Sequence, residues 1–308
     1  MTSPSDYQVF DLRLRSSLPL PELFPIDAVG EADVSIELGA VPEAEQAEPG
    51  LTTFGKSLLL VVPDVGRYRI ESGNRITVEP EPGVPDRNVR LFLLGSAFGA
   101  LLHQRGLLPL HANAVEIGGS AAAFMGESGA GKSTLAAWFH DEGYRVIADD
   151  VCVVGFDEEG RPFATPGLPR LRLWAEALEL MGRGTAGFQR SYIDTTRQLD
   201  KFDVPIDADG VSLSHVQLAA LYVLDTSDIF SVERLYGIDA AEAIFANTYR
   251  GSFVVTAGGQ QRHWQSVVRL VETTPVYRAS RRWDLGELDA QSRRLLEHAV
   301  NVIAGGSE

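Results

Sequence analysis

The feature that most constrains this chain is a phosphate-binding loop, which matches the pattern G-x-x-x-x-G-K-[ST]. An apolar run at 121–125 precedes the loop, and a helix is predicted over 132–140, so the motif has its strand–loop–helix context. Glycines allow consecutive N–H groups to curl around phosphate oxygens, and the helix N-terminus adds partial positive charge. The residues expected to hold the nucleotide are Gly126, Glu127, Ser128, Gly129, Ala130, Gly131, Lys132, Ser133 and Thr134.

Two residues of this loop predict the ligand. Lys132 is expected to reach the β- and γ-phosphates, and the Ser133 hydroxyl is expected to face Mg²⁺. ATP and Mg²⁺ are therefore the predicted cofactors. The alternative is a glycine-rich turn without a ligand.

An acidic pair follows the predicted helix. The apolar strand 144–148 runs into Asp149 and Asp150, and parallel strands of a β–α–β unit end at one edge of the sheet. Successive strand residues point to opposite faces, so both acids can reach the site only if the backbone kinks there. Acids at a phosphate site can hold Mg²⁺ or accept a hydroxyl proton. The alternative is a solvated acidic turn.

The order of these elements resembles the catalytic core of the HPr kinase/phosphorylase family. His111 precedes the loop, the loop reads G-x-S-G-x-G-K-S, and an Ala-Asp-Asp follows the next helix; the match covers about residues 107–155. The resemblance implies a serine kinase with a fold akin to phosphoenolpyruvate carboxykinase. It implies that Asp149 is the catalytic base, that Asp150 and Ser133 serve Mg²⁺, and that His111 lies near the phosphates or near Asp149.

The segment 167–174 departs from that family, because it lacks a glycine-rich Ile-Arg-Gly type of loop. Arg170 and Arg172 stand there instead, two residues apart and therefore on one face of an extended chain. They are predicted to clamp phosphate or a substrate carboxylate, with two solvated arginines as the alternative. This segment resembles the kinases of peptide natural-product clusters, which implies a lasso precursor peptide, phosphorylated on a serine of its tail, as the substrate.

Several other residues are weaker candidates. Lys201 and Arg250 each lie in polar surroundings that are typical of surface ion pairs. Asp225 ends an apolar run, which is the form of a Walker-B strand, and is the second choice for a metal ligand. The preferred interpretation is a turn residue at the end of a core strand. The segment 257–262 has the form of a transporter signature, but no Asp-Glu strand follows it, so a loop is predicted.

Composition restricts the partners. The 308 residues carry a formal net charge of −15, which disfavours nucleic acid and anionic membranes as partners. A lone cysteine, Cys152, excludes an internal disulfide and suits a reducing compartment. The N-terminus lacks the pattern of a signal peptide, and the most apolar run, 91–102, is too short to span a bilayer. These observations predict a cytoplasmic protein.

The chain is expected to be α/β, with a β-rich N-terminal domain over 1–85 and a P-loop, HPr-kinase-like catalytic domain over 86–308. Strands are predicted at 34–38, 58–62, 68–70 and 76–78, and helices at 90–105, 240–249 and 289–303. The stretch 182–211 shows little periodicity and is predicted to be a mobile lid.

The leading hypothesis is an ATP- and Mg²⁺-dependent kinase acting on a serine of a peptide or protein. Two alternatives stay open: a non-catalytic ATP-binding regulatory module, and a kinase of a small hydroxylated metabolite. The N-terminal domain is of a size suited to docking a peptide. Whether the chain forms a homo-oligomer is also open.

Overall fold

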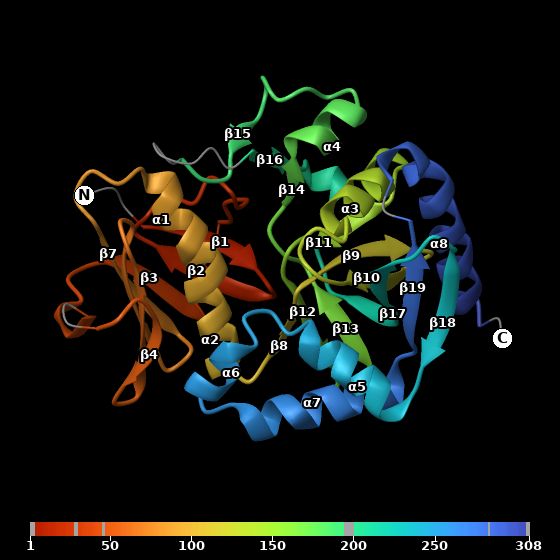
Figure 1. The fold of residues 1–308 in the computed structure, drawn as a ribbon. Helices are drawn as coiled ribbons and strands as arrows, with labels where there is room; N and C mark the ends of the chain where they lie inside the picture. The colour runs from red at the N-terminus through yellow and green to blue at the C-terminus, as the bar shows by residue number, and fades with distance from the viewer. Residues whose placement is uncertain (1–3, 28–29, 45–46, 194–199, 283, 306–308) are drawn as a thin grey trace. The chain divides into compact units, whose positions relative to one another are not determined.

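A computed structural model describes residues 4–27, 30–44, 47–193, 200–282 and 284–305 of this mixed α/β chain, which contains several sheets (Figure 1). The chain divides into two compact units. The first comprises Met1–Leu107, Arg190–Asp200 and Arg250–His263, and the second comprises Leu108–Gln189, Lys201–Tyr249 and Trp264–Glu308. The predicted domain boundary at residue 85 lies inside the first unit, before its long helical segment; as a functional division it stays a prediction.

The first unit is built on a seven-stranded sheet, as the alternation of apolar and polar residues in its N-terminal part predicts. The predicted helix over 90–105 is confirmed as α1 (Asp86–Phe92), a π-helical turn (Leu93–Ala97) and α2 (Phe98–Gln104). Tyr68 from the sheet donates a hydrogen bond to the Val89 carbonyl of α1 (2.9 Å), which ties the helix to the sheet. In spatial order the strands are β1 (Ser5–Val9), β2 (Leu12–Ser16), β3 (Val34–Leu38), β7 (Arg75–Pro80), β6 (Gly66–Glu71), β5 (Ser57–Val62) and β4 (Gly50–Phe54).

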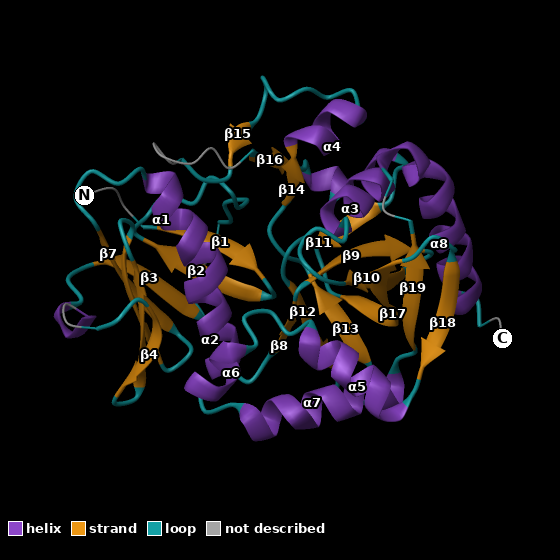
Figure 2. Cartoon of the chain, viewed as in Figure 1, coloured by secondary structure: helices purple, strands orange, loops and turns teal. Residues whose placement is uncertain are grey.

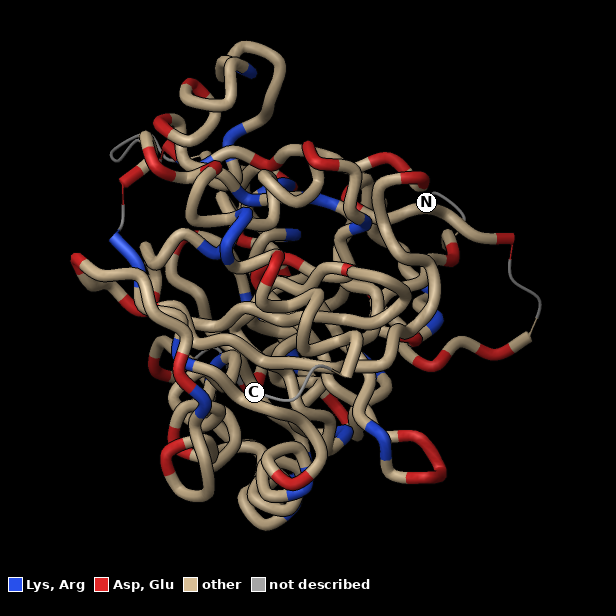
Figure 3. The backbone as a smooth tube through the Cα atoms, turned by 90° about the vertical axis from the view of Figure 1, so that its right-hand side faces the viewer, with Lys and Arg blue, Asp and Glu red and all other residues tan. Residues whose placement is uncertain are grey.

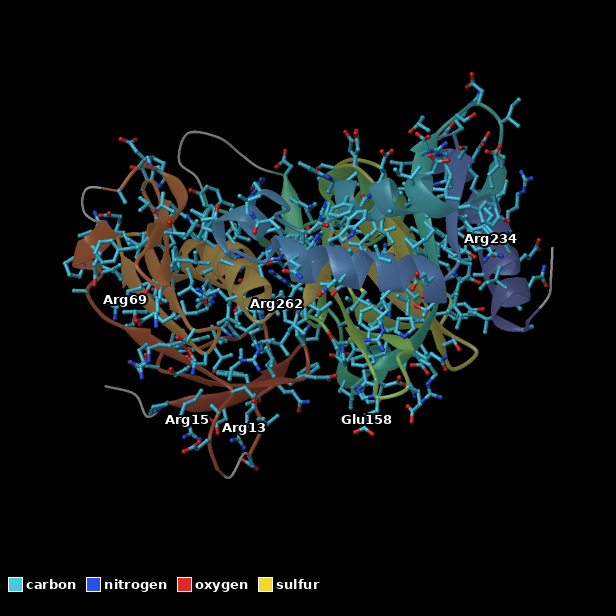
Figure 4. The ribbon with its side chains drawn as sticks, turned by 90° about the horizontal axis from the view of Figure 1, so that it is seen from below. Arg13, Arg15, Arg69, Glu158, Arg234 and Arg262 are labelled. Atoms are coloured by element: carbon cyan, nitrogen blue, oxygen red, sulfur yellow. The ribbon has the colours of Figure 1, made fainter. Side chains whose placement is uncertain are left out.

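Arginines on this sheet are paired with acids. Figure 4 labels Arg13 and Arg15 on β2 and Arg69 on β6. Arg15 contacts Asp6 at 2.8 Å, and Arg69 contacts Glu43 at 2.9 Å. Figure 3 shows acidic residues spread along the whole chain and interspersed with basic ones. Exposed pairs of this kind contribute little to stability, but they reduce the local positive charge.

The second unit contains the sheet that carries the phosphate-binding loop. β9 (Ala112–Ile117) pairs antiparallel with both β10 (Ser120–Met125) and β11 (Arg145–Ala148), so β10 and β11 are parallel to each other with β9 between them. The helix that connects them, α3 (Lys132–Asp141), lies where the sequence predicts it. The C-terminal ends of β10 and β11 therefore share one edge of the sheet, as expected.

Further strands extend this sheet on the other side of β10. β17 (Val216–Thr226) is parallel to β10 and to β19 (Val276–Arg281), and β18 (Ser231–Leu235) closes that side. The start of β17 also pairs with a small antiparallel group formed by β13 (Pro162–Thr165), β12 (Cys152–Phe156) and β8 (Leu108–Leu110).

Helices cover both faces of this sheet (Figure 2). On one face, α3 and α8 (Leu288–Ile303) pack on Phe124 and Tyr222, with ring stacking between the two strands that carry them. On the other face, α5 (Gly237–Ala246) and α7 (Gln260–Thr273) pack on the alanine-rich side of β9 and β10. A short helix, α6 (Ser252–Thr256), precedes α7 and belongs to the first unit.

A separate three-stranded sheet lies over the outer side of α3. It contains β14 (Arg170–Trp174), β16 (Lys201–Pro205) and β15 (Gln189–Arg190), and α4 (Ala175–Leu180) follows β14. Leu171, Leu173 and Phe202 of this sheet pack on Ala136 and Ala137 of α3. The predicted lid over 182–211 is therefore wrong where β15 and β16 form, and its part at 194–199 lies outside the described residues. Within the described chain, no helix combines the length and apolarity needed to cross a membrane.

Candidate functional site: the phosphate-binding loop and its acidic edge

The loop between β10 and α3 adopts backbone conformations at its glycines that disfavour any other residue. Gly126 has φ +148°, and a Cβ atom there would lie 3.0 Å from the Leu224 carbonyl oxygen of β17. Gly131 precedes the first residue of α3 with a left-handed φ of +80°. These conformations are strained for residues with a side chain, so the glycines set the path of the loop.

Lys132 folds back over this loop. Its ammonium group donates hydrogen bonds to the carbonyl oxygens of Gly126 (2.7 Å) and Glu127 (3.0 Å). Burial lowers the pKa of Lys132 to about 8, while the nearby Asp150 and Asp149 act in the opposite direction. A phosphate at the loop would add negative charge and favour the protonated lysine.

Three residues that the sequence reasoning missed hold the loop in place. The Gly126 N–H donates to Asn247 Oδ1 at 2.8 Å, the Asn113 amide donates to the Lys132 carbonyl oxygen, and Arg281 donates to the Ala130 carbonyl oxygen at 3.0 Å. Each comes from a different element: Asn247 follows α5, Asn113 lies on β9, and Arg281 is the last residue of β19. No local motif marks them, because only the folded chain brings them to the loop.

The acidic pair lies at the end of β11, where the backbone leaves strand geometry. β11 ends at Ala148, its register with β9 shifts between Val146 and Ala148, and Asp150 has a left-handed φ of +72°. The predicted kink is confirmed. It turns two successive carboxylates toward one region, which a regular strand cannot do.

Asp149 is the more deeply buried acid of the pair, with 5% of its surface exposed. Its Oδ2 accepts a hydrogen bond from the Arg172 backbone N–H at 2.8 Å, whereas Oδ1 has no donor at hydrogen-bonding geometry among the described residues. Burial raises the pKa of Asp149; the Arg172 N–H and the Ser133 hydroxyl act in the opposite direction. A buried carboxylate with a raised pKa and an oxygen that lacks a hydrogen-bond partner is suited to accept a proton.

Asp150 has the opposite character. Burial alone would raise the pKa of Asp150, but the charges of Arg172, His111 and Lys201 hold it below its ordinary value. Arg172 Nη1 donates to its Oδ2 at 3.0 Å, and His111 Nδ1 lies 3.6 Å from its Oδ1. Asp150 is therefore a stable anion, as a magnesium ligand must be.

His111 contacts the backbone of the same acid. Its Nδ1 lies 3.1 Å from the Asp150 carbonyl oxygen, which can only accept, so Nδ1 carries the proton and Nε2 is the free acceptor. Burial and the charge of Lys132 lower the pKa of His111, which keeps the ring neutral near pH 7. The resemblance placed His111 near the phosphates, and the structure does bring it to the loop.

Arg170 and Arg172 lie on the same face of β14, as their spacing predicts. Asp203 of β16 joins them, 2.6 Å from Arg170 Nη1 and 3.5 Å from Arg172 Nε. Asp150 and Asp203 outweigh the effect of burial and raise the pKa of Arg172 above its ordinary value. Arg172 Nη2 is buried without a hydrogen-bond partner among the described residues, so Arg172 retains donors for an anion.

A cavity of about 340 Å³ brings these groups together. It is bounded by the loop, the acidic edge and the three-stranded sheet. Five of the predicted residues do not line the cavity: Gly126, Glu127, Ala130, Asp149 and Arg170. Asp149 is nevertheless adjacent to two lining residues, because it precedes Asp150 and accepts a hydrogen bond from the Arg172 N–H. The described residues that line it are His111, Ser128, Gly129, Gly131, Lys132, Ser133, Thr134, Asp150, Arg172, Trp174, Glu176, Ala177, Lys201 and Leu285.

The weaker candidates fall in different places. Lys201 lines the cavity, whereas Arg250 belongs to the first unit. Asp225 lies near the exposed end of the core strand β17, 4.0 Å from Arg278, and does not line the cavity. The loop predicted over 257–262 is confirmed at 257–259, a turn between α6 and α7, but it is wrong at 260–262, which form the start of α7. Cys152 is buried in β12, and burial raises the pKa of its thiol to about 12, so it is not a nucleophile.

The site fits a magnesium ion that is shared with phosphate. Among the described residues, no group of three or more His, Cys, Asp or Glu side chains could hold a metal ion by itself. Mg²⁺ in phosphoryl-transfer sites is held by one or two protein oxygens together with substrate phosphates. Asp150 and Ser133 supply oxygen atoms of this kind at the cavity beside the loop.

Comparison with known proteins adds little beyond this geometry. No protein-family model matches the chain, and no curated protein matches it. Among solved structures, it is similar to one described as the Hpr(Ser) kinase/phosphatase from Coxiella burnetii, with a TM-score of 0.34 and 11% sequence identity. The match covers 64% of this chain and 93% of that chain. Values this low assign neither fold nor function, so the conclusions below depend on the residues of the site.

Proposed function

We propose that this protein is an ATP- and Mg²⁺-dependent kinase that transfers the γ-phosphoryl group to a hydroxyl group. The observation that carries the proposal is Asp149, a buried carboxylate beside the phosphate-binding loop, with a raised pKa and one oxygen that has no hydrogen-bond partner among the described residues. A site that only bound nucleotide would need an acid to hold Mg²⁺, which Asp150 supplies, but it would not need Asp149 as a second acid. General bases in enzymes are tuned upward by burial in this way.

In the proposed reaction, the acceptor oxygen forms a bond to the γ-phosphorus, and the bond from phosphorus to the β–γ bridging oxygen breaks. The electron pair of that bond leaves with ADP, and the hydroxyl proton passes to Asp149. Asp150 and Ser133 would hold Mg²⁺ together with the nucleotide, and the ion would supply positive charge that offsets the charge of the phosphates. The rest of the catalysis is positioning of groups around the loop.

Other residues of the site have supporting roles in this scheme. Lys132 would exchange its hydrogen bonds to the loop carbonyls for bonds to the β- and γ-phosphates. Arg172, oriented by Asp150 and Asp203, would offer its remaining N–H groups to a phosphate. His111 holds the carbonyl of Asp150 and thereby its left-handed backbone, which presents the carboxylate to the cavity.

For the acceptor, we propose a serine of a peptide or protein, with the tail of a lasso precursor peptide as the specific substrate. The support is the order of His111, the loop and the acidic pair, which resembles the serine kinases of the HPr kinase type, together with segment 167–174. A cytoplasmic location is a further expectation that follows from the composition, and whether the chain forms a homo-oligomer stays open.

The test is intact-mass analysis of serine-ended peptides after incubation with the protein, ATP and Mg²⁺, with Asp149→Asn and Lys132→Ala proteins in parallel. A phosphoryl mass gain only with the unaltered protein supports a peptide kinase. If ATP binds but no phosphoryl group is transferred, even in a single turnover with peptides and with small hydroxylated compounds, the kinase proposal is wrong and a nucleotide-binding regulatory module replaces it.

A further inference from the structure

Lys201 occupies a position in the cavity that the proposed reaction does not yet use. It is the first residue of β16 and pairs in register with Trp174 of β14, and both residues line the cavity beside the loop. Its ammonium group lies 5.7 Å from the centroid of the Trp174 ring. The chain contains only three lysines, Lys56, Lys132 and Lys201, and two of them line this one cavity.

The charge of Lys201 acts on the centre of the site. It lowers the pKa of His111, Lys132, Asp149 and Asp150 alike. Three of these groups, His111, Lys132 and Asp150, line the same cavity as Lys201. The positive charge of Lys201 therefore lies in the cavity where Lys132 is expected to meet the β- and γ-phosphates.

Lys201 is not committed to a carboxylate. Within the described chain it makes no ion pair, whereas Arg172 is held by both Asp150 and Asp203. Contact with an exposed aromatic ring is weak and easily exchanged. A lysine has a flexible four-carbon stem and three rotatable donors, so it can leave the ring and reach an anion nearby.

We propose that Lys201 is a second phosphate-binding cation, which rests on Trp174 in the free protein and contacts the γ-phosphate of bound ATP. This inference rests on the proposed function, because it needs a nucleoside triphosphate at the loop. Its position on β16, two residues before Asp203, gives the three-stranded sheet a role. Asp203 orients Arg172 from the same strand that supplies Lys201, so β14 and β16 together form a wall of positive charge facing the loop.

The test compares affinities for Mg²⁺ complexes of ADP and of the β,γ-imido analogue of ATP, measured by calorimetry on the full chain. We expect Lys201→Met to lower the affinity for the triphosphate by roughly tenfold or more, because one charge-assisted hydrogen bond is lost. The affinity for ADP should change by less than about twofold. Lys201→Arg, which keeps the charge, should recover most of the affinity. Lys56→Met, at an exposed turn, is the matched control and should change neither.

Two results would overturn the inference: an equal loss for both nucleotides, or no loss for the triphosphate. Circular dichroism and the midpoint of thermal unfolding identify a variant that is misfolded. If Lys201→Met is misfolded, Lys201→Arg decides the test: a preference for the triphosphate over ADP equal to that of the unaltered protein supports the inference, and a lost preference overturns it. Failure of the proposed function is a separate result. If the unaltered protein binds the triphosphate but transfers no phosphoryl group, the kinase proposal is wrong, while the affinities of the Lys201 variants still decide the role of Lys201. If the unaltered protein binds neither nucleotide, the inference is wrong as well.

Discussion

At the scale of the residue, the site separates the properties of two adjacent acids. Burial raises the pKa of Asp149, whereas Arg172, His111 and Lys201 lower the pKa of Asp150 against the same effect. Neighbouring carboxylates whose pKa values differ in this way can take different roles, one as a proton acceptor and one as a permanent anion. The kink at Asp150 brings both side chains to one region, and the neighbours of each carboxylate then set its pKa.

The first prediction concerns the proton acceptor. Asp149→Asn keeps the shape of the side chain but cannot accept the proton, so phosphoryl transfer should fall by about 10²–10⁴-fold. Affinity for ATP should change little, because Asp149 is not needed to hold the phosphates. Rapid-quench assays and calorimetry measure the two quantities. A transfer rate near that of the unaltered protein would show that Asp149 is not the base.

The second prediction concerns pH. Asp149 must be deprotonated, and its pKa is raised, so kcat/KM for ATP should fall as the pH drops through a value above 3.8. Lys132 must be protonated, and its pKa in the free protein is about 8, so kcat/KM should also fall as the pH rises through about 8. Lys132→Arg should move the alkaline limb upward, because arginine stays charged. An unchanged alkaline limb in that variant would assign it to another group.

At the scale of the element, the loop depends on contacts from strands and helices distant in sequence. Its glycines can be read from the motif, but its anchors come from β9, β19 and the end of α5. Asn247 is the clearest of them. Its side-chain oxygen accepts the Gly126 N–H, and its amide donates to the Ala243 carbonyl oxygen of α5 at 2.8 Å.

The third prediction follows from this anchor. Asn247→Ala leaves the buried Gly126 N–H without a partner, which should cost about 1–3 kcal/mol of unfolding free energy. The start of the loop should loosen, and affinity for ATP should fall by about tenfold. Asn247→Asp keeps the acceptor and should bind ATP more tightly than the alanine variant. Urea unfolding and calorimetry measure both effects; equal ATP affinity in Asn247→Ala and the unaltered protein would remove Asn247 from the loop's support.

At the scale of the whole molecule, the second unit builds its site where three layers meet. The central sheet ends at the loop, α3 begins there, and the three-stranded sheet packs on the outer side of α3. Phosphate binding at such a junction connects several elements that the unfolded chain keeps apart. Ligand binding should therefore be visible as added stability.

The fourth prediction measures that stability. ATP with Mg²⁺ at 100 times its Kd should add about 2.7 kcal/mol and raise the Tm by roughly 5 °C. Lys132→Ala, which removes the phosphate-binding ammonium group, should show little or no shift at the same concentration. Scanning calorimetry with and without nucleotide provides the measurement. A shift in Lys132→Ala equal to that of the unaltered protein would place the nucleotide elsewhere.

Much of this site was predictable because its main parts are local in sequence. The loop, α3 and the acidic pair lie within 126–150, and the kink follows from two adjacent acids having to reach one region. The sequence also indicated that Arg170 and Arg172 share a face, since that depends only on strand periodicity. The predicted lid over 182–211 was wrong where β15 and β16 form, because pairing with β14 determines those strands rather than local periodicity.

The sequence alone determined the phosphate-binding loop, the helix that follows it and the placement of two acids beyond that helix, because each depends on backbone preferences over a few residues. Only the tertiary structure decided which acid is buried and which is paired. It also brought Asn113, Asn247 and Arg281 to the loop, Lys201 to the cavity wall and Asp203 to Arg172. Burial and charge at a site are set by segments that meet only on folding, and no local pattern records those meetings.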